Sequence, residues 1–192
     1  MNEEDNHLDS DTLEMLSNNT RAGHGDYWYW RDKPEGEYGA AKSVLEDAGR
    51  RVEGLRSLPR EEQHPDLEAD IDGQRSAIEV TELVHQESLQ RSIREKCCYY
   101  FEWSRDSFLN TLQEVICRKD NVNIKEGYEK FILIIVTDEF IINKFCVSDW
   151  LSNAEFDVKN ITSIYLGLSY HPEVGGNGSC PVFELNLQRE SN

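Results

Sequence analysis

The order of apolar and polar positions along the chain predicts several helices of ordinary length. Residues 35–48 are good helix formers with apolar residues at helical spacing, and Gly49 follows them as a stop signal. Residues 86–118 carry a longer apolar stripe, which predicts one long helix or two. Residues 144–154 predict a further helix that begins after Asn143. We expect these helices to cover a sheet.

The strand pattern is strongest in the second half of the chain. Residues 131–136 form a continuous run of apolar and β-branched side chains, which predicts a central strand buried on both faces. Residues 162–170 and 181–187 also have the pattern of strands, whereas residues 51–58 fit a short strand or a loop equally well. Because strands and helices alternate in a mixed order, the sequence predicts an α/β (α+β) fold with one mixed sheet flanked by helices.

The length of the chain predicts one domain. The 192 residues are enough for one hydrophobic core and few for two. Residues 1–25 are rich in Asn, Asp, Glu and Ser, so we expect a disordered acidic tail followed by a single domain over residues 26–192. The sequence has neither the apolar run of a membrane span nor the pattern of a signal peptide, and we expect a cytoplasmic protein.

The most informative segment is residues 66–83, which has the pattern of an acidic β-hairpin. In residues 66–71 carboxylates alternate strictly with apolar side chains, so the first arm has one acidic and one apolar face. The pair Asp72-Gly73 is a strong signal for a two-residue hairpin turn. After the turn, the apolar residues Ile78 and Val80 return to the apolar face. The two arms are therefore expected to share one carboxylate-rich face.

The register of this hairpin decides which carboxylates meet. A two-residue turn sets Asp66 opposite Glu79. A four-residue loop over residues 72–75 would instead pair Glu68 with Glu79 and Asp66 with Thr81. In either register, like charges at cross-strand spacing repel each other, and a cation would relieve the repulsion. One alternative is a solvated outer face of an edge hairpin, where charge deters aggregation.

A hard divalent cation suits a cluster of carboxylate oxygens. Mg²⁺ needs only one or two carboxylates when water and a substrate phosphate complete its octahedron. A bound Mg²⁺ or Mn²⁺ can activate a water molecule and offset charge on a phosphate, which suits phosphodiester hydrolysis. The histidines His64 and His85 flank the two arms and are further candidates for a general base or a ligand.

At these residues the sequence resembles the PD-(D/E)XK nuclease-like (restriction endonuclease-like) superfamily. The resemblance spans roughly residues 35 to 140, and it implies a core of a helix, a hairpin, a crossover helix and a further strand. Three elements carry it: Pro65-Asp66 is similar to the PD element, Glu79-Val80-Thr81 to the (D/E)XK element, and Glu37 to the acidic residue of the preceding helix.

The resemblance implies a set of site residues and one departure from the family pattern. Asp66 and Glu79 would bind Mg²⁺ or Mn²⁺, with Glu68 or Glu37 assisting, and the catalytic set would be Asp66, Glu79 and Thr81. Thr81 stands where the family has a lysine, and threonine carries no charge. A lysine from elsewhere in the chain could take its place, and the candidates are Lys96, Lys119 and Lys125. The alternative, which the sequence favours for each of them, is an ordinary surface lysine.

The formal net charge of −17 bears directly on the choice of partner. Binding of nucleic acid rests largely on Lys and Arg side chains that neutralise phosphates, so an acidic chain needs local basic clusters. If such clusters line the carboxylate site, they favour a nucleic-acid partner. The candidate clusters are Arg50, Arg51, Arg56 and Arg60 near the first strand, and Arg91, Arg94 and Lys96 in the helical segment after the hairpin.

Two functions from different classes follow. The first is a divalent-metal-dependent nuclease that hydrolyses phosphodiester bonds in DNA or RNA. The second is a noncatalytic acidic protein on the same fold, which meets a basic protein partner or mimics nucleic acid in an inhibitor or immunity role. The missing lysine and the acidic charge favour the second. The retained PD and EXT elements on one face favour the first, and the sequence leads us to expect a nuclease-like protein.

Overall fold

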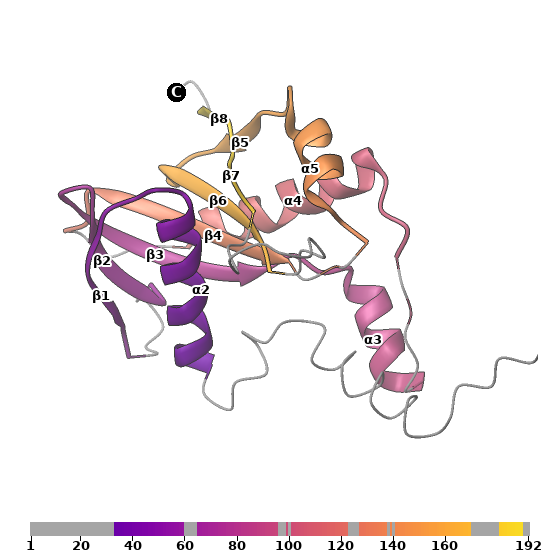
Figure 1. The fold of residues 1–192 in the computed structure, drawn as a ribbon, viewed down its shortest axis with the longest axis horizontal. Helices are drawn as coiled ribbons and strands as arrows, with labels where there is room; N and C mark the ends of the chain where they lie inside the picture. Colours follow the sequence, from indigo (N-terminus) through magenta and orange to yellow (C-terminus); the bar gives the residue numbers. More distant parts are fainter. Residues whose placement is uncertain are drawn as a thin grey trace, which may run out of the picture.

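In the computed structural model, a six-stranded mixed sheet forms the centre of an α/β domain (Figure 1). The structure describes residues 33–59, 65–95, 99, 101–122, 127–137, 139, 141–169 and 181–189. The expected tail of residues 1–25 lies outside the described residues. So do His64, Arg60, Lys96 and Lys125, which the sequence analysis also singled out.

The described elements alternate between helices and strands. The helices are α2 (Lys33–Asp47), α3 (Gln86–Glu95), α4 (Arg105–Asp120) and α5 (Lys144–Leu151). The strands are β1 (Val52–Ser57), β2 (Leu67–Ile71), β3 (Gln74–Glu82), β4 (Lys130–Thr137), β5 (Phe156–Val158), β6 (Ser163–Leu168), β7 (Val182–Glu184) and β8 (Leu187–Arg189).

The large sheet has the strand order β1-β2-β3-β4-β6-β7. Strands β3, β4 and β6 are parallel to one another, whereas β1, β2 and β7 join it in antiparallel pairs. Strands β5 and β8 form a separate two-stranded parallel sheet. The expected mixed sheet flanked by helices is therefore confirmed, and the two-stranded sheet is an addition to it.

The helix boundaries follow local capping signals. Gly49, with a φ of 72°, lies two residues after the end of α2 and supplies the left-handed conformation that stops a helix. Residues 86–118 contain parts of two helices rather than one, because Ser104 and Ser107 form a capping box at the start of α4. Helix α5 begins after Asn143, whose side chain accepts hydrogen bonds from the backbone of Phe145 and Cys146.

Two strand predictions change in the structure. Residues 51–58 contain a strand, β1, with a register shift between Glu53 and Arg56 where Gly54 has a φ of 64°. Residues 181–187 do not form one strand, which corrects the sequence-based prediction. Strand β7 pairs with β6 and ends at Glu184, and the next residue, Leu185, is buried. The chain then continues into β8, which pairs with β5 in the other sheet. This change of partner depends on strands that are distant in sequence, so the local pattern did not indicate it.

The sheet has a separate apolar core on each face. Helix α2 covers one face, and the side chains in that core are Ala40, Ala41, Val44, Leu45, Leu67, Ala69, Ile71, Ile78, Val80, Ile132, Ile134, Val136 and Tyr165. Helix α4 covers the other face, where its Phe108, Leu112, Val115 and Ile116 pack against Ala77, Phe131, Leu133 and Ile135. Strand β4 contributes to both cores, as expected for a central strand buried on both faces.

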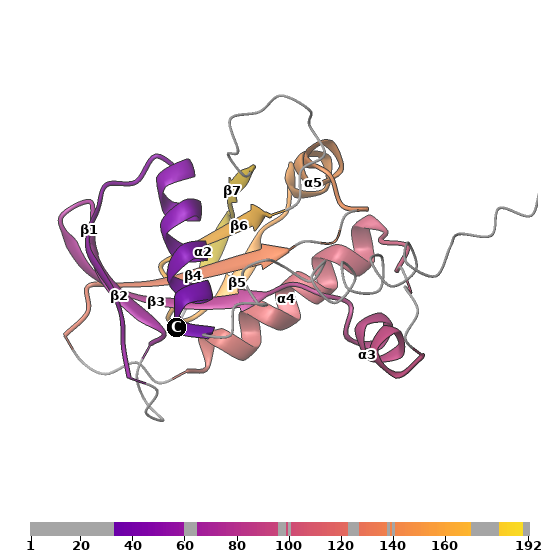
Figure 2. The ribbon, with the colours of Figure 1, turned by 60° about the horizontal axis from the view of Figure 1, so that its bottom comes forward.

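Helix α3 stands apart from the sheet in both views of the ribbon (Figure 1 and Figure 2). It follows β3 and lies at the side of the molecule, near the start of α4. Its side chains with described burial are exposed or half-buried. Within the described part of the chain, no helix has the length and apolar character that a membrane crossing requires.

Candidate active site

The turn between β2 and β3 sets the geometry of the acidic hairpin. Asp72 and Gly73 have φ values of 55° and 85°, and two successive positive φ angles define the type I′ turn that joins antiparallel strands tightly. Ile71 pairs with Gln74 and Leu67 pairs with Ile78. The register expected for a two-residue turn is therefore confirmed, and the alternative four-residue loop is not formed.

Asp66 lies directly before β2 and next to the middle of β3. Its Oδ2 accepts a hydrogen bond of 2.9 Å from the backbone N–H of Val80. Strand β2 begins at Leu67, opposite Ile78, whereas β3 runs on to Glu82. The Asp66 carboxylate therefore accepts the hydrogen bond that a backbone carbonyl would accept if β2 were longer. This contact brings Asp66 beside Glu79, the neighbour of Val80 in β3.

Glu79 is buried and paired with a lysine from α4. The Nζ atom of Lys119 lies 2.6 Å from Glu79 Oε2. Burial raises the pKa of the Glu79 carboxyl, and the negative charge of Asp66 raises it further, whereas Lys119 lowers it; the net direction is upward. Lys119 therefore stabilises the ionised form of Glu79 by less than burial and Asp66 destabilise it.

Lys119 reaches this position because it continues the buried stripe of α4. Val115 and Ile116 lie one turn earlier on the side of α4 that faces the sheet. The next residue, Asp120, is buried and accepts hydrogen bonds from the backbone N–H groups of residues 159–161, which anchors the end of the helix. Of the three lysines that the sequence analysis named, Lys119 contacts Glu79, and the other two lie outside the described residues.

Glu37 of α2 is the third carboxylate of this corner. Its side chain is buried and forms an ion pair of 3.0 Å with Lys33, one helical turn earlier. Its negative charge contributes to the raised pKa of Glu79. The charges of Asp66 and Glu37 both act on Glu79, and Lys119 and Lys33 pair with Glu79 and Glu37.

Glu68 does not join this group, which differs from the expected metal-binding set. Its carboxylate accepts hydrogen bonds from Arg56, Arg75 and Tyr128. These partners lower the pKa of Glu68 to about 2, with the Tyr128 hydroxyl as the largest cause. The physical reason is the two-residue turn, which pairs Glu68 with Ala77 instead of Glu79. We therefore leave Glu68 out of the candidate metal ligands.

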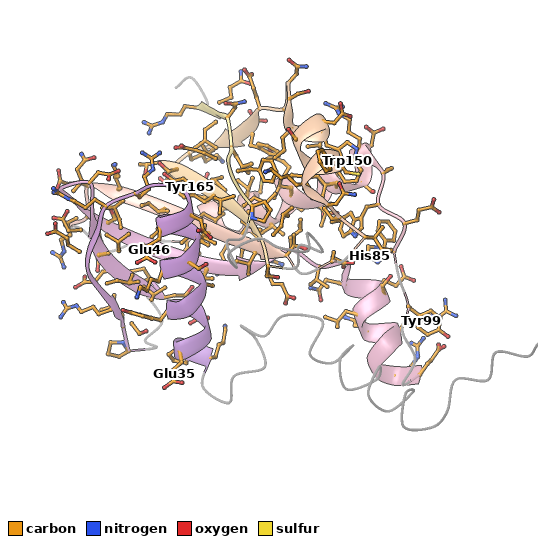
Figure 3. The ribbon with its side chains drawn as sticks, in the orientation of Figure 1. Glu35, Glu46, His85, Tyr99, Trp150 and Tyr165 are labelled. Atoms are coloured by element: carbon orange, nitrogen blue, oxygen red, sulfur yellow. The ribbon has the colours of Figure 1, made fainter. Side chains whose placement is uncertain are left out.

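Thr81 is a buried residue of β3, two positions after Glu79 on the same face of the sheet. It brings no charge to the site. His85 lies at the junction of β3 and α3 (Figure 3). Its ring stacks on Phe101 at 3.6 Å, and its Nδ1 contacts the hydroxyl of Ser88 at 2.8 Å. These contacts give His85 a packing role at the start of α3.

A divalent ion at this corner would take its protein ligands from Asp66 and Glu79, and Lys119 already pairs with Glu79. Among the described residues, no group of three or more His, Cys, Asp or Glu side chains is placed so that it could hold a metal ion. Asp66 and Glu79 supply two carboxylates, which is the number that Mg²⁺ commonly takes from protein when water and phosphate complete the shell. Burial, and after it the charge of Asp66, raises the pKa of Glu79, and a bound cation would favour its ionised form.

The basic clusters of the sequence analysis are largely paired with carboxylates. Arg50 contacts Glu184 and Asp72, and Arg51 contacts Glu53. The other described members have these partners: Arg56 contacts Glu68, and both Arg91 and Arg94 contact Glu95. Arg56 lies on the carboxylate-rich face of the hairpin. The sequence analysis did not identify Arg75 and Tyr128 as site residues. Both donate hydrogen bonds to Glu68, although they are 53 positions apart in the sequence, so only the folded structure brings them together.

Comparison of the chain with protein-family models, with curated proteins and with solved structures found no match.

Proposed function

We propose that the chain is a divalent-metal-dependent nuclease-like protein of the PD-(D/E)XK type that hydrolyses phosphodiester bonds in DNA or RNA. In this proposal Asp66 and Glu79 hold Mg²⁺ or Mn²⁺, and Lys119 replaces the motif lysine that Thr81 lacks. The observation that carries the proposal is the 2.6 Å contact between Lys119 Nζ and Glu79 Oε2. The ammonium group of Lys119 contacts Glu79, the carboxylate of the second motif element, although the two residues are 40 positions apart in the sequence.

The arrangement of elements supports a restriction endonuclease-like core. Helix α2 precedes the acidic hairpin, helices α3 and α4 follow it, and β4 then pairs in parallel with the second arm of the hairpin. This order agrees with the core that the sequence resemblance implies. The two motif arms also meet in the required register, with Asp66 bonded to the residue after Glu79.

Each residue of the site has a defined task in the proposed reaction. The metal, when bound, supplies a Lewis acid and lowers the pKa of a water molecule for attack on phosphorus. Asp66 and Glu79 fix its position, because the Val80 N–H orients Asp66 and burial restricts Glu79. Lys119 presents an ammonium group that can donate to the attacking water or to a phosphate oxygen and stabilise negative charge in the transition state. Glu37 adds negative charge that favours cation binding.

A second candidate function rests on a different observation. The formal charge is −17, and the described arginines of both predicted basic clusters already contact carboxylates. These features favour a noncatalytic protein that binds a basic partner or mimics nucleic acid. Metal binding at Asp66 and Glu79 separates the two candidates, because an acidic interaction surface has no requirement for a specific divalent ion.

The first experiment measures metal binding by isothermal titration with Mn²⁺ and Mg²⁺. We expect saturable binding to the wild-type chain and its loss in Asp66→Asn and in Glu79→Gln, because each substitution removes one charged ligand. Asp70→Asn is the matched control, since Asp70 is a half-buried carboxylate of the same strand that lies outside the corner. Absence of binding at millimolar metal contradicts the nuclease proposal and supports the acidic interaction protein.

The second part of the test follows cleavage of single- and double-stranded DNA and RNA over a pH series that extends above neutrality, because the pKa of Glu79 is raised. Lys119→Met should keep metal binding but lower the cleavage rate roughly 10²–10³-fold, the usual cost of removing one preorganised donor. Lys144→Met, an exposed lysine of α5, serves as the control. Thr81→Lys in the Lys119→Met background should restore part of the rate. Equal cleavage by wild type and Lys119→Met rules out the assigned role of Lys119.

A further inference from the structure

A second polar cluster adjoins the candidate active site on the same face of the sheet. It consists of Arg56 in β1, Glu68 in β2, Arg75 in β3 and Tyr128 just before β4, and we call it the arginine cluster. The Arg56 side chain donates to Glu68 Oε1, with its Nε at 2.8 Å. Arg75 Nη2 and the Tyr128 hydroxyl donate to Glu68 Oε2 at 3.1 Å and 2.7 Å.

Local structure holds the arginine cluster in place. Ala77 is the cross-strand partner of Glu68, and its small side chain leaves room for Tyr128 to reach the carboxylate. The guanidinium of Arg75 lies over the Tyr128 ring, 4.8 Å from its centroid. Gly127 has a φ of 108°, and a Cβ atom there would approach Arg75 Nη1 to 3.6 Å. The contact of 3.6 Å is an ordinary one, but the positive φ favours glycine, so another residue would strain the backbone just before Tyr128.

Within the arginine cluster two guanidinium groups face one carboxylate, and further carboxylates adjoin it: Asp70 is the cross-strand partner of Arg75, and Glu129 accepts a hydrogen bond from the Arg75 N–H. Glu68 accepts hydrogen bonds from Arg56, Arg75 and Tyr128. Burial and the neighbouring Glu68 raise the pKa of the Tyr128 hydroxyl, so the phenol is neutral. Two guanidinium groups thus share one carboxylate. The carboxylate side chain is 10% exposed, whereas the side chains of Arg56 and Arg75 are 68% and 56% exposed.

This exposure pattern leaves guanidinium donors directed at solvent. An arginine has five N–H donors, and Glu68 has only two oxygens to receive bonds from both arginines and the tyrosine. Glu68 therefore acts as a buried anchor that orders two long side chains before any ligand arrives. Ordered guanidinium groups with remaining donors are suited to phosphate, which they bind through paired hydrogen bonds.

The arginine cluster is close to the candidate metal ligands. Glu68 and Asp66 are two positions apart, a spacing of about 7 Å along a strand. Arg56 is the cross-strand partner of Glu68 in β1. Neighbouring phosphates of a single strand can bridge such a distance. The cluster thus lies where the backbone flanking a phosphate at Asp66 and Glu79 would pass.

We propose that Arg56 and Arg75 form a docking site for the phosphodiester backbone of a nucleic-acid strand. The position of the cut phosphate at Asp66 and Glu79 rests on the proposed function, whereas the docking itself does not. Glu68 and Tyr128 are positioning residues in this scheme, because they order the two guanidinium groups.

The same protein contains a matched control for this proposal. At α3, Arg91 and Arg94 contact Glu95, and Tyr99 both donates to Glu95 and lies under Arg91. This second group has the same composition as the arginine cluster, two arginines, one glutamate and one tyrosine. It lies beside the outlying helix α3, away from the acidic hairpin (Figure 3). Its carboxylate side chain is 36% exposed and offers a less buried anchor.

The experiment measures binding of fluorescein-labelled oligonucleotides by fluorescence anisotropy. Single-stranded DNA and RNA and their duplexes are titrated with the full chain in Ca²⁺ and in EDTA, over a range of NaCl concentrations. Arg56→Gln/Arg75→Gln should weaken binding by about tenfold or more and reduce the slope of log Kd against log salt by roughly 1.4–1.8, the value for two lost phosphate contacts. Arg91→Gln/Arg94→Gln, with the same change in charge, should bind as the wild type does.

Further variants separate docking from folding. Arg56→Lys/Arg75→Lys keeps both charges and the partners of Glu68 but loses bidentate geometry, so it should lose affinity only several-fold. Thermal unfolding verifies that each variant is folded at the assay temperature. Equal weakening by both glutamine pairs, or no binding of any oligonucleotide by the wild type, overturns the docking site.

The outcomes also distinguish this proposal from the proposed function. Mn²⁺ titration of Arg56→Gln/Arg75→Gln should match the wild type, because neither arginine is a metal ligand. If the wild type neither binds metal nor cleaves, but its oligonucleotide binding depends on Arg56 and Arg75, the docking site stands and the nuclease proposal fails. If it binds metal and cleaves while the arginine variants keep wild-type affinity and KM, the nuclease proposal stands and the docking site fails.

Discussion

At the scale of single residues, the corner of Asp66, Glu79 and Lys119 combines opposing electrostatic effects. Burial and the charge of Asp66 disfavour the ionised form of Glu79, and Lys119 favours it. The first two effects prevail, because the pKa of Glu79 is raised. Carboxyl groups whose pKa is shifted by burial and by a specific charge partner are found more often at functional sites. The site residues are therefore expected to cost stability in the absence of a bound cation.

Asp66→Asn should make the metal-free chain more stable at neutral pH, by about 1 kcal/mol, because it removes a like-charge neighbour of Glu79. The asparagine Oδ1 still accepts the Val80 N–H. For a chain of this size, that gain corresponds to roughly 2–4 °C in Tm. Thermal unfolding in EDTA over a pH series measures it, with Asp70→Asn as the control.

The pH dependence of this gain has a fixed sign. A carboxyl with a raised pKa in the folded state contributes stability below its unfolded pKa and loses that contribution as pH rises through the folded pKa. The pKa of Glu79 is raised, so the difference between wild type and Asp66→Asn should grow with rising pH and vanish in acid. A variant that is less stable than the wild type at neutral pH speaks against electrostatic strain at this corner.

At the scale of elements, the approach of α2 to the sheet depends on one glycine. A Cβ atom at Gly167 of β6 would come within 2.7 Å of Val44 Cγ2, closer than packed side chains allow. The same helix carries Glu37 to the candidate site, so the fit between α2 and β6 affects the site electrostatics. The acidic hairpin is the opposite case, because its register follows from its own turn residues, Asp72 and Gly73.

Gly167→Ala should destabilise the chain by about 1–3 kcal/mol, the usual cost of overpacking a core. Val44→Ala opens the space that the new methyl group needs, so the double variant should be more stable than the sum of the single effects implies. Urea unfolding of the four proteins gives the coupling free energy. Strictly additive effects would show that the contact between Gly167 and Val44 does not limit the position of α2.

At the scale of the whole molecule, carboxylates outnumber cations by far. The chain has 37 Asp and Glu residues against 20 Lys and Arg residues. Many described arginines contact carboxylates, which softens the imbalance locally but leaves a strongly negative surface. A charge far from zero destabilises a compact chain by self-repulsion, and salt screens that repulsion over a Debye length of about 10 Å at 0.1 M.

Raising NaCl from low to moderate concentration should therefore raise the Tm in EDTA by several degrees. Screening of about 1 kcal/mol corresponds to roughly 2–4 °C at this chain length. Differential scanning calorimetry measures the shift. Tetramethylammonium chloride should act equally, because screening needs only ionic strength. A larger effect of Na⁺ would instead point to cation binding at specific carboxylates, and no effect of either salt contradicts the self-repulsion argument.

The sequence by itself determined the features that depend on neighbours along the chain. The Asp72-Gly73 turn set the pairing of Asp66 with Glu79, the run 131–136 indicated the central strand, and Asn143 marked the start of α5. Turns, caps and periodic apolar faces act over a few residues, so a local pattern contains them. The α/β class followed from their order.

Only the tertiary structure decided which distant side chains meet. Three lysines were candidates to replace the missing motif lysine, and the packing of α4 on the sheet brought Lys119 to Glu79. The same holds for Arg56, Arg75 and Tyr128, which surround Glu68 and remove it from the expected metal-binding set. Contacts between elements depend on how apolar faces pack in three dimensions, and the spacing of residues along the chain does not carry that information.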